Sequence, residues 1–226
     1  MNRDSNAYTI TYASVMVVLV AVLLAFTSES LRSYQKKNEA DDKRQQILRS
    51  VKVSVSGNET ERKYKELIKE SFLVNDKGER ITGDAFAVDA AKMFSENTYP
   101  VFVAHIDGGT KYVLAMHGMG LWGPVWGYIS VNEDKNTVFG TDFSHQGETP
   151  GLGAEIATSK FSAQFPGKHI FLENEFKSIA VVKPGKTAQG QDYVDGISGG
   201  TITSNAVDQM IRNSLKHYVG FLNAKK

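Results

Sequence analysis

The sequence contains no cysteine among its 226 residues. This absence excludes disulfide bonds, thiolate-ligated zinc, iron–sulfur clusters and cysteine nucleophiles. The chain also has no excess of charge of one sign. It contains 26 Lys and Arg and 25 Asp and Glu, which give a formal net charge of +1. Nucleic-acid binding depends on a basic face that neutralises phosphates, so this balance argues against a nucleic-acid partner. The lack of cysteine leaves the cellular compartment open.

Several catalytic patterns are missing too. None of the five histidines belongs to an H-x-x-H or H-E-x-x-H set, so we expect no transition-metal site. The G-x-S-x-G elbow of serine hydrolases does not occur, nor does a Walker phosphate loop with its lysine. We therefore predict no catalytic residues in the chain itself. The hydrophobic fraction of 41% and the charged fraction of 23% are those of a globular protein.

One segment is far more apolar than the rest of the chain. Tyr8 to Phe26 contains 19 residues without a charge, and as a helix it would span about 28 Å, close to the hydrocarbon thickness of a bilayer. A cleaved signal peptide and a buried core helix are the alternatives. The following Thr27–Leu31 offers no A-x-A cleavage pattern. We predict that residues 1–27 are an uncleaved, single-pass membrane anchor.

The orientation of this anchor does not follow simply from charge. Only Arg3 and the α-amino group precede the span, whereas five basic residues follow it closely. These are Arg32, Lys36, Lys37, Lys43 and Arg44. Counted literally, the positive-inside rule places the C-terminal domain in the cytoplasm. The span itself holds no charged residue, so we do not expect this chain alone to conduct ions.

Residues 28–95 read as a helical stalk followed by an α/β lead-in. Ser28–Ser50 is rich in charge and is predicted to be helical, and Glu59–Ser71 has the spacing of an amphipathic helix. Asn75–Gly78 has the composition of a hairpin turn between two apolar runs. A further short helix is predicted for Ala85–Phe94.

Residues 96–226 are predicted to form the main soluble domain, in which strands come first. The predicted strands are Val101–Ile106, Lys111–Met116, Val125–Val131, Val138–Phe143 and Ser178–Val182. A helix is predicted for Ala154–Phe165, with Ile156 and Phe161 facing inward. The C-terminal helix is marked by apolar residues at helical spacing, namely Val207, Met210, Ile211, Leu215, Tyr218, Val219 and Leu222. Because strands and helices are partly segregated, we predict an α+β fold, an antiparallel sheet flanked by helices.

A glycine-rich stretch lies just before the C-terminal helix. Residues 195–204 read Asp-Gly-Ile-Ser-Gly-Gly-Thr-Ile-Thr-Ser. Glycines let the backbone approach a ligand closely, and a helix start offers unpaired N–H groups to an anion. The stretch is therefore a candidate phosphate site. The alternative is a glycine turn followed by an ordinary Ser or Thr helix cap.

Two further stretches have the composition of shaped loops. Residues 147–155 read Gly-Glu-Thr-Pro-Gly-Leu-Gly-Ala-Glu, with side chains able to hydrogen-bond a heterocycle. A plain loop whose acid favours a helix N-terminus is the alternative. Residues 118–127 read Gly-Met-Gly-Leu-Trp-Gly-Pro-Val-Trp-Gly, where an indole between glycines suits the wall of a flat ligand. Here the alternative is an aromatic core residue.

These three stretches together resemble the FMN-binding domain family. The run D-G-I-S-G-G-T resembles the flavinylation signature D-x-x-[ST]-G-A-[ST], and G-L-W-G and E-T-P-G-L-G-A-E-I resemble family motifs in the same order. With the anchor, the chain is similar to the C subunits of sodium-translocating NADH:quinone reductases. The G subunits of Rnf electron-transport complexes share this layout and are the alternative. Gly200 departs from the signature, where Ala is usual.

The resemblance implies roles for specific residues. Thr201 matches the family residue joined to FMN through a phosphoester bond, and Asp195 matches the acid of the signature. The residues expected to line the phosphate are Ser198, Gly199 and Gly200. The residues matching the loops near the isoalloxazine ring are Leu121, Trp122, Glu148, Thr149, Leu152 and Gly153.

The resemblance also implies a function. The chain would carry covalent FMN as an electron-transfer cofactor in a respiratory complex that oxidises NADH, reduces ubiquinone and transports sodium. Its partners would be the other membrane subunits and, during maturation, a flavin transferase that uses FAD and Mg²⁺ outside the bacterial cytoplasmic membrane. This implication overrides the charge count and puts the FMN domain on the outer, periplasmic side. A noncovalent flavin-binding module and a structural subunit with a vestigial signature remain as alternatives.

Overall fold

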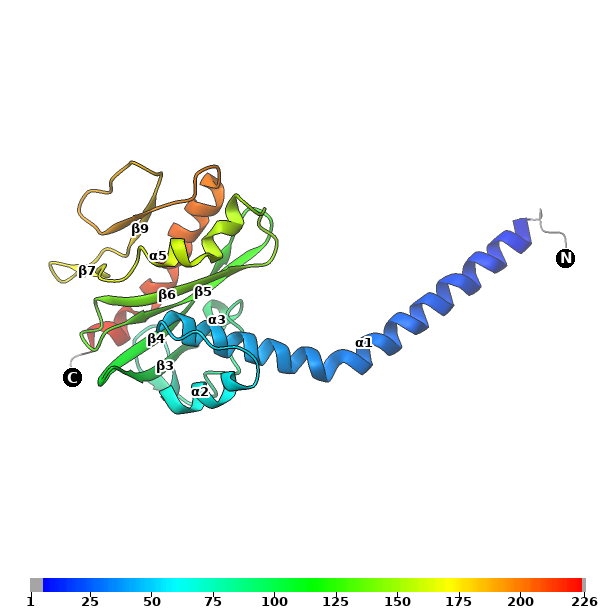
Figure 1. The fold of residues 1–226 in the computed structure, drawn as a ribbon, viewed down its shortest axis with the longest axis horizontal. Helices are drawn as coiled ribbons and strands as arrows, with labels where there is room; N and C mark the ends of the chain where they lie inside the picture. The colour runs from blue at the N-terminus through cyan, green and yellow to red at the C-terminus, as the bar shows by residue number, and fades with distance from the viewer. Residues whose placement is uncertain (1–5, 225–226) are drawn as a thin grey trace. The chain divides into compact units, whose positions relative to one another are not determined.

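The computed structural model describes residues 6–224. The chain divides into two compact units, Met1–Lys43 and Arg44–Lys226 (Figure 1). Arg3, which entered the charge count above, lies outside the described residues.

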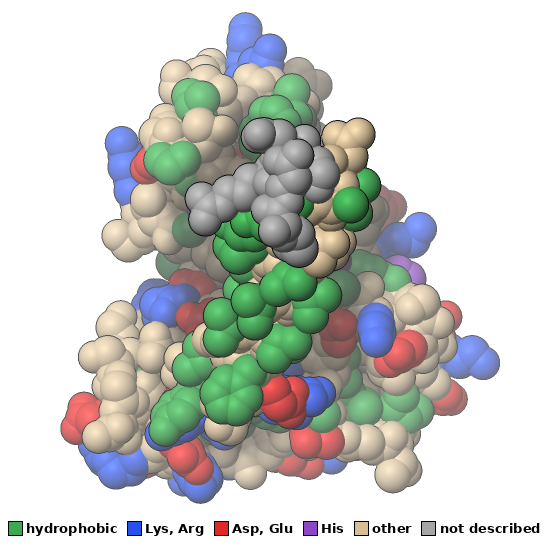
Figure 2. Space-filling model, turned by 90° about the vertical axis from the view of Figure 1, so that its right-hand side faces the viewer, with side chains coloured by type: hydrophobic (Ala, Val, Ile, Leu, Met, Phe, Trp, Pro, Cys, Tyr) green, Lys and Arg blue, Asp and Glu red, His purple; other side chains and the backbone are tan. Residues whose placement is uncertain are grey.

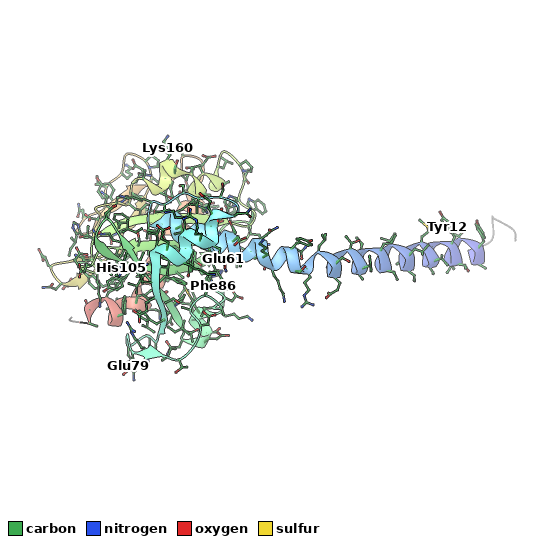
Figure 3. The ribbon with its side chains drawn as sticks, turned by 60° about the horizontal axis from the view of Figure 1, so that its bottom comes forward. Tyr12, Glu61, Glu79, Phe86, His105 and Lys160 are labelled. Atoms are coloured by element: carbon green, nitrogen blue, oxygen red, sulfur yellow. The ribbon has the colours of Figure 1, made fainter. Side chains whose placement is uncertain are left out.

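The first unit is helical throughout its described part. Helix α1 runs from Asn6 to Ser50 without interruption. Its apolar stretch is long enough to cross a membrane, and none of that stretch is buried in the protein. Exposed apolar side chains such as Val17 and Leu23, at 67% and 64% exposure, surround it. They are green in Figure 2, and Figure 3 shows Tyr12 among them. The predicted apolar helix is confirmed, and its length and exposure are those of a single-pass membrane anchor.

The last turns of α1 belong to the second unit, where they pack on a sheet. Ile47 and Leu48 are fully buried. Arg49 forms a bidentate ion pair with Asp142, with N–O distances of 2.8 and 3.0 Å. The indole N–H of Trp126 donates to the Gln46 side chain at 3.0 Å. These buried and charged contacts hold the last turns of α1 on the sheet.

The second unit is built on a six-stranded antiparallel sheet in the order β2-β1-β3-β4-β5-β6. Its strands are β1 (Ile68–Val74), β2 (Arg80–Ile81), β3 (Tyr99–Ile106), β4 (Gly109–Met119), β5 (Pro124–Val131) and β6 (Val138–His145). Helix α5 (Thr201–Asn223) covers one face, where the Phe221 ring meets Phe72 and Tyr112 at centroid distances of 5.9 and 5.4 Å. The end of α1 lies on the opposite face. The expected α+β class, an antiparallel sheet with flanking helices, is confirmed.

Short elements complete the unit. They are α2 (Glu59–Leu67), α3 (Met93–Glu96), the 3-10 helix η1 (Gly153–Ala157), α4 (Ser159–Ser162), the β7–β8 hairpin (Phe171–Leu172 and Glu175–Phe176) and the parallel pair β9 (Ala180–Val182) and β10 (Tyr193–Asp195). In Figure 1 the yellow-green turns of η1 and α4 lie beside the orange start of α5. This arrangement brings three loops together at one end of α5.

Three predicted helices are wrong in part. The helix expected for Glu59–Ser71 ends at Leu67, because the next residues form β1 and bury Phe72 against β3. The helix expected for Ala85–Phe94 is mostly turns, since the Asp84 and Asp89 carboxylates accept hydrogen bonds from the N–H groups two residues on, a local alternative to helix.

The helix expected for Ala154–Phe165 is split into η1 and α4. Thr158 has extended backbone angles, φ −86° and ψ 150°, between the two elements. Its hydroxyl donates to the Glu155 carbonyl at 2.7 Å, which ends the first turn. Ile156 and Phe161 are buried as predicted. The apolar pattern therefore identified the buried face, although the helix itself is interrupted.

Candidate functional site

The three loops singled out in the sequence line one cavity at the start of α5. Its volume is about 240 Å³. The lining residues are Leu121, Glu148, Thr149, Leu152, Gly153, Gly199, Gly200, Thr201, Ile202 and Thr203. They come from the β4–β5 loop, the segment between β6 and η1, and the turn before α5. Segments 80 residues apart in the chain thus meet at a helix N-terminus.

Four hydroxyl groups lie near this helix start. Ser198, in the turn before α5, is exposed, and the three in the first turn of α5 differ in availability. Thr203 is 2% exposed and its hydroxyl donates to Glu148 Oε2 at 2.5 Å. Ser204 is 5% exposed and its Oγ accepts the Ile197 N–H at 2.8 Å. Thr201, the first residue of α5, is exposed. Of these three, Thr201 is the hydroxyl that a large reactant can reach.

The two glycines before Thr201 play different structural parts. Gly199 has a φ of +77°, and a Cβ there would lie 2.8 Å from Leu152 Cδ2. That backbone conformation favours glycine and disfavours other residues. Gly200 has a φ of −108°, and a Cβ there would lie 3.1 Å from Ile197 Cβ. Alanine, the usual residue of the signature, would fit at Gly200 after a small shift of its neighbours. The backbone conformation at this position does not require glycine, so either residue can stand there.

Glu148 is a buried carboxylate that joins the three loops. It is 4% exposed. Its Oε1 accepts the Trp122 N–H at 3.0 Å, and the Leu121 N–H also donates to the carboxylate. Its Oε2 accepts the Thr203 hydroxyl of α5. The side chain therefore acts as a structural junction between the β4–β5 loop and the first turn of α5.

This junction is tightly enclosed and stays ionised. Burial alone would raise the pKa of Glu148, but the hydrogen bonds from Thr203, Trp122 and Leu121 outweigh it and hold the pKa below its ordinary value. A Cβ on Gly120 would lie 2.5 Å from Glu148 Oε1. A Cβ on Gly153 would collide with Glu148 Oε2 and with the Thr203 hydroxyl. The two glycines thus leave room for the carboxylate.

Not all of the predicted site residues lie in this cavity. Asp195 and Ser198 line a neighbouring cavity of about 740 Å³ together with Glu155, Lys160 and Gln164. The Lys160 side chain lies at the periphery, as labelled in Figure 3. Trp122 joins the site through its backbone N–H, while its side chain is 68% exposed. The signature turn therefore separates two openings, with Thr201 on one side and Asp195 on the other.

Three contacts of this region have no local signal in the sequence. They are the hydrogen bonds of Thr203 to Glu148 and of Ser204 to Ile197, and the two hydrogen bonds that join the Gln164 side chain to Asp195. Such partners lie 7 to 55 residues apart in the chain, so no spacing rule identifies them.

Comparison with known proteins gives the same assignment as the motifs. The family model of the FMN-binding domain matches residues 120–216. Among curated proteins, the C subunit of the Na(+)-translocating NADH-quinone reductase of Vibrio anguillarum is 31% identical over 227 residues, covering 91% of this chain and 89% of that protein. The corresponding protein of Haemophilus ducreyi is 29% identical and covers 97% and 91%.

Solved structures extend the similarity to three dimensions. The crystal structure of the same reductase component from Parabacteroides distasonis superposes with a TM-score of 0.85 at 66% identity, covering 87% of this chain and 98% of that one. Shewanella oneidensis NqrC shares the fold, with a TM-score of 0.69 at 24% identity and coverage of 83% and 97%. The chain therefore belongs to the NqrC family, the C subunits of the Na(+)-translocating NADH-quinone reductase, and it carries the FMN-binding domain.

Proposed function

We propose that this protein carries FMN bound covalently to Thr201 through a phosphoester bond and serves as an electron carrier within the reductase. The single observation that supports it best is the contrast among neighbouring hydroxyls. Thr201 is exposed at the start of a 23-residue helix, whereas Thr203 and Ser204 are buried and already hydrogen-bonded. Ser198 is exposed too, but it lies in the turn before the helix and not in its first turn.

The residues around Thr201 fit a phosphate group. The first turn of α5 offers backbone N–H groups and the positive end of a helix dipole. Gly199 and Gly200 add no side chains of their own to the approach to this turn, and Gly199 is exposed. Ser198 is exposed beside them. A cavity of about 240 Å³ is smaller than the roughly 300–1,000 Å³ of typical ligand pockets, so it suits the phosphate end of FMN better than the whole molecule.

Attachment can be written as a balanced transfer from FAD. The Thr201 oxygen forms a bond to the phosphorus on the riboflavin side, and the phosphoanhydride bond between the two phosphates breaks. AMP leaves with the bonding electron pair, and the hydroxyl proton passes to water. A separate flavin transferase with Mg²⁺ would catalyse this step, and the Asp195 carboxylate would assist it or be recognised by that enzyme.

Bound FMN supplies one- and two-electron redox chemistry. The protein's part is to hold the cofactor in place through a tether that cannot dissociate. Glu148 keeps the Leu121–Trp122 loop and the start of α5 in a fixed relation, and Thr149, Leu152 and Gly153 line the same cavity. We place the isoalloxazine ring against these loops.

We also propose that α1 anchors the chain in the bacterial cytoplasmic membrane with the FMN domain on the outer side. The charge count of the flanking residues favours the opposite orientation. Attachment by a transferase outside the cytoplasm and the value of a tether to an exported flavoprotein support our choice.

Mass spectrometry of the intact, denatured chain tests the attachment. Protein from cells that contain the transferase should carry one FMN, and Thr201→Ala should lose both that mass and the in-gel flavin fluorescence while remaining folded. Thr201→Ser should keep some attachment because the hydroxyl is retained. Thr187→Ala, a change of an exposed threonine elsewhere, is the matched control and should keep FMN. FMN retained by Thr201→Ala, or released from the wild type on denaturation, would contradict covalent attachment at this residue.

A further inference from the structure

The side chain of Gln164 forms a paired contact with the main chain of Asp195. Its Nε2 donates to the Asp195 carbonyl at 3.1 Å, and its Oε1 accepts the Asp195 N–H at 3.0 Å. Asp195 is the last residue of β10, whose other neighbour is the parallel strand β9. The amide of Gln164 thus takes the place of a further strand at this one position.

The main chain after Asp195 is held in a similar way by other elements. The Gly196 N–H donates to the Val182 carbonyl of β9 at 2.7 Å. The Ile197 N–H donates to Ser204 Oγ of α5 at 2.8 Å. Three successive N–H groups are therefore each bound by a partner from a different element. The Asp195 side chain is exposed, and the backbone held by these partners sets the direction of its Cα–Cβ bond.

Gln164 and Asp195 also share an opening. Both line the cavity of about 740 Å³ on the side of the signature turn away from Thr201, and Ser198 lines it with them. A reactant or enzyme that reads the Asp195 carboxylate would reach it from this cavity. A side chain that takes part in a reaction must be held in the productive geometry by the residues around it.

We infer that Gln164 is a positioning residue for flavin attachment: it fixes the Asp195 main chain and thereby the carboxylate that the attachment reaction requires. This inference rests on the proposed function, because it concerns the step that joins FMN to Thr201. It does not give Gln164 contact with the reacting atoms.

Substitutions at Gln164 can separate its two hydrogen bonds. Gln164→Met keeps the length of the side chain and removes both bonds. Gln164→Glu keeps an oxygen that accepts the Asp195 N–H. It replaces the Nε2 donor by a second oxygen, so the hydrogen bond to the Asp195 carbonyl is lost. Gln164→Asn keeps both groups on a shorter side chain. Gln189→Met, the same chemical change in an exposed loop, is the matched control.

Two measurements on the full-length protein in detergent test the inference. The first is the rate of FMN attachment with purified transferase, FAD and Mg²⁺, followed by mass. We expect Gln164→Met to slow it at least tenfold at saturating FAD and Gln189→Met to leave it within twofold. The second is amide hydrogen exchange of the FMN-free protein, where Asp195 should exchange at least tenfold faster in Gln164→Met. Attachment should slow in the order in which the three Gln164 variants speed this exchange.

Two results would overturn the inference. One is a wild-type attachment rate in a variant whose Asp195 amide exchanges faster. The other is slow attachment with unchanged exchange at Asp195, which would mean that Gln164 acts by another route. Should Gln164→Met unfold, Gln164→Asn and Gln164→Glu supply the same comparison. FMN that remains on Thr201→Ala would instead refute the proposed function, so the two failures are distinguishable.

Discussion

The buried carboxylate of Glu148 offers the sharpest test of how the site is held together. We expect Thr203→Val to remove the hydrogen bond to Glu148 Oε2 while preserving the shape of the side chain. A hydrogen bond to an ionised group contributes about 1.5–3 kcal/mol, so the free energy of unfolding should fall by about that amount. Glu148→Gln weakens the bonds from the Trp122 and Leu121 N–H groups as well, and should cost about 2–4 kcal/mol.

The two changes should not be additive, because they remove the same interaction. In a double-mutant cycle we expect a coupling of about 1–2 kcal/mol between Glu148→Gln and Thr203→Val. The assay is urea unfolding of the full-length protein in detergent, followed by tryptophan emission. Glu155→Gln is the matched control: this carboxylate accepts a single N–H at 3.2 Å, and its loss should change stability by less than about 0.5 kcal/mol.

The pH dependence has a definite sign. The pKa of Glu148 is lower in the folded protein than its ordinary value of 4.5. The ionised form therefore stabilises the fold fully above about pH 4.5, and this contribution disappears as pH falls through the folded pKa. The stability gap between wild type and Glu148→Gln should narrow below about pH 4. Two results together would refute the role of Glu148 as a junction: a coupling energy between Glu148→Gln and Thr203→Val under about 0.3 kcal/mol, and a stability difference between wild type and Glu148→Gln that does not change with pH.

Three further predictions concern the glycines and the anchor. Gly199→Ala should destabilise the signature turn by about 1 kcal/mol or more and slow FMN attachment, because the φ of Gly199 is +77°. Gly200→Ala should leave the attachment rate unchanged. Equal attachment rates of the two variants, followed by mass over time, would contradict these roles. Gly220→Ala should lower the melting temperature, because a Cβ there would collide with the backbone of Lys77 and Gly78. Helix propensity alone predicts the opposite, a gain in stability of about 1 kcal/mol. A rise in melting temperature would show that the contact with Lys77 and Gly78 is loose. A reporter active only outside the cytoplasm, fused to the C-terminus, should be active, and a cytoplasm-only reporter should be silent; the reverse would favour the positive-inside count.

The features that the sequence determined are those encoded by neighbouring residues. The uncharged run from Tyr8 to Phe26 predicts a membrane helix because hydrophobicity acts locally and the bilayer thickness sets its length. The strands β3 to β6 follow from short apolar runs, and helix α5 follows from apolar side chains with a period of 3.6 residues. The glycine-rich turn before Thr201 and its order among the three motifs were enough to indicate the family.

Contacts between distant residues required the tertiary structure. Lys69–Ser71 extend a helical pattern, yet they form a strand because pairing with β3 buries Phe72 and Leu73. The sequence predicts a ligand contact for Glu148, and only the structure adds that Thr203, 55 residues away, holds the carboxylate by a hydrogen bond. Gln164 meets Asp195 across 31 residues. Such pairs form only when the sheet and α5 bring them together, because the free energy that selects them comes from burial and long-range hydrogen bonding rather than from local propensity.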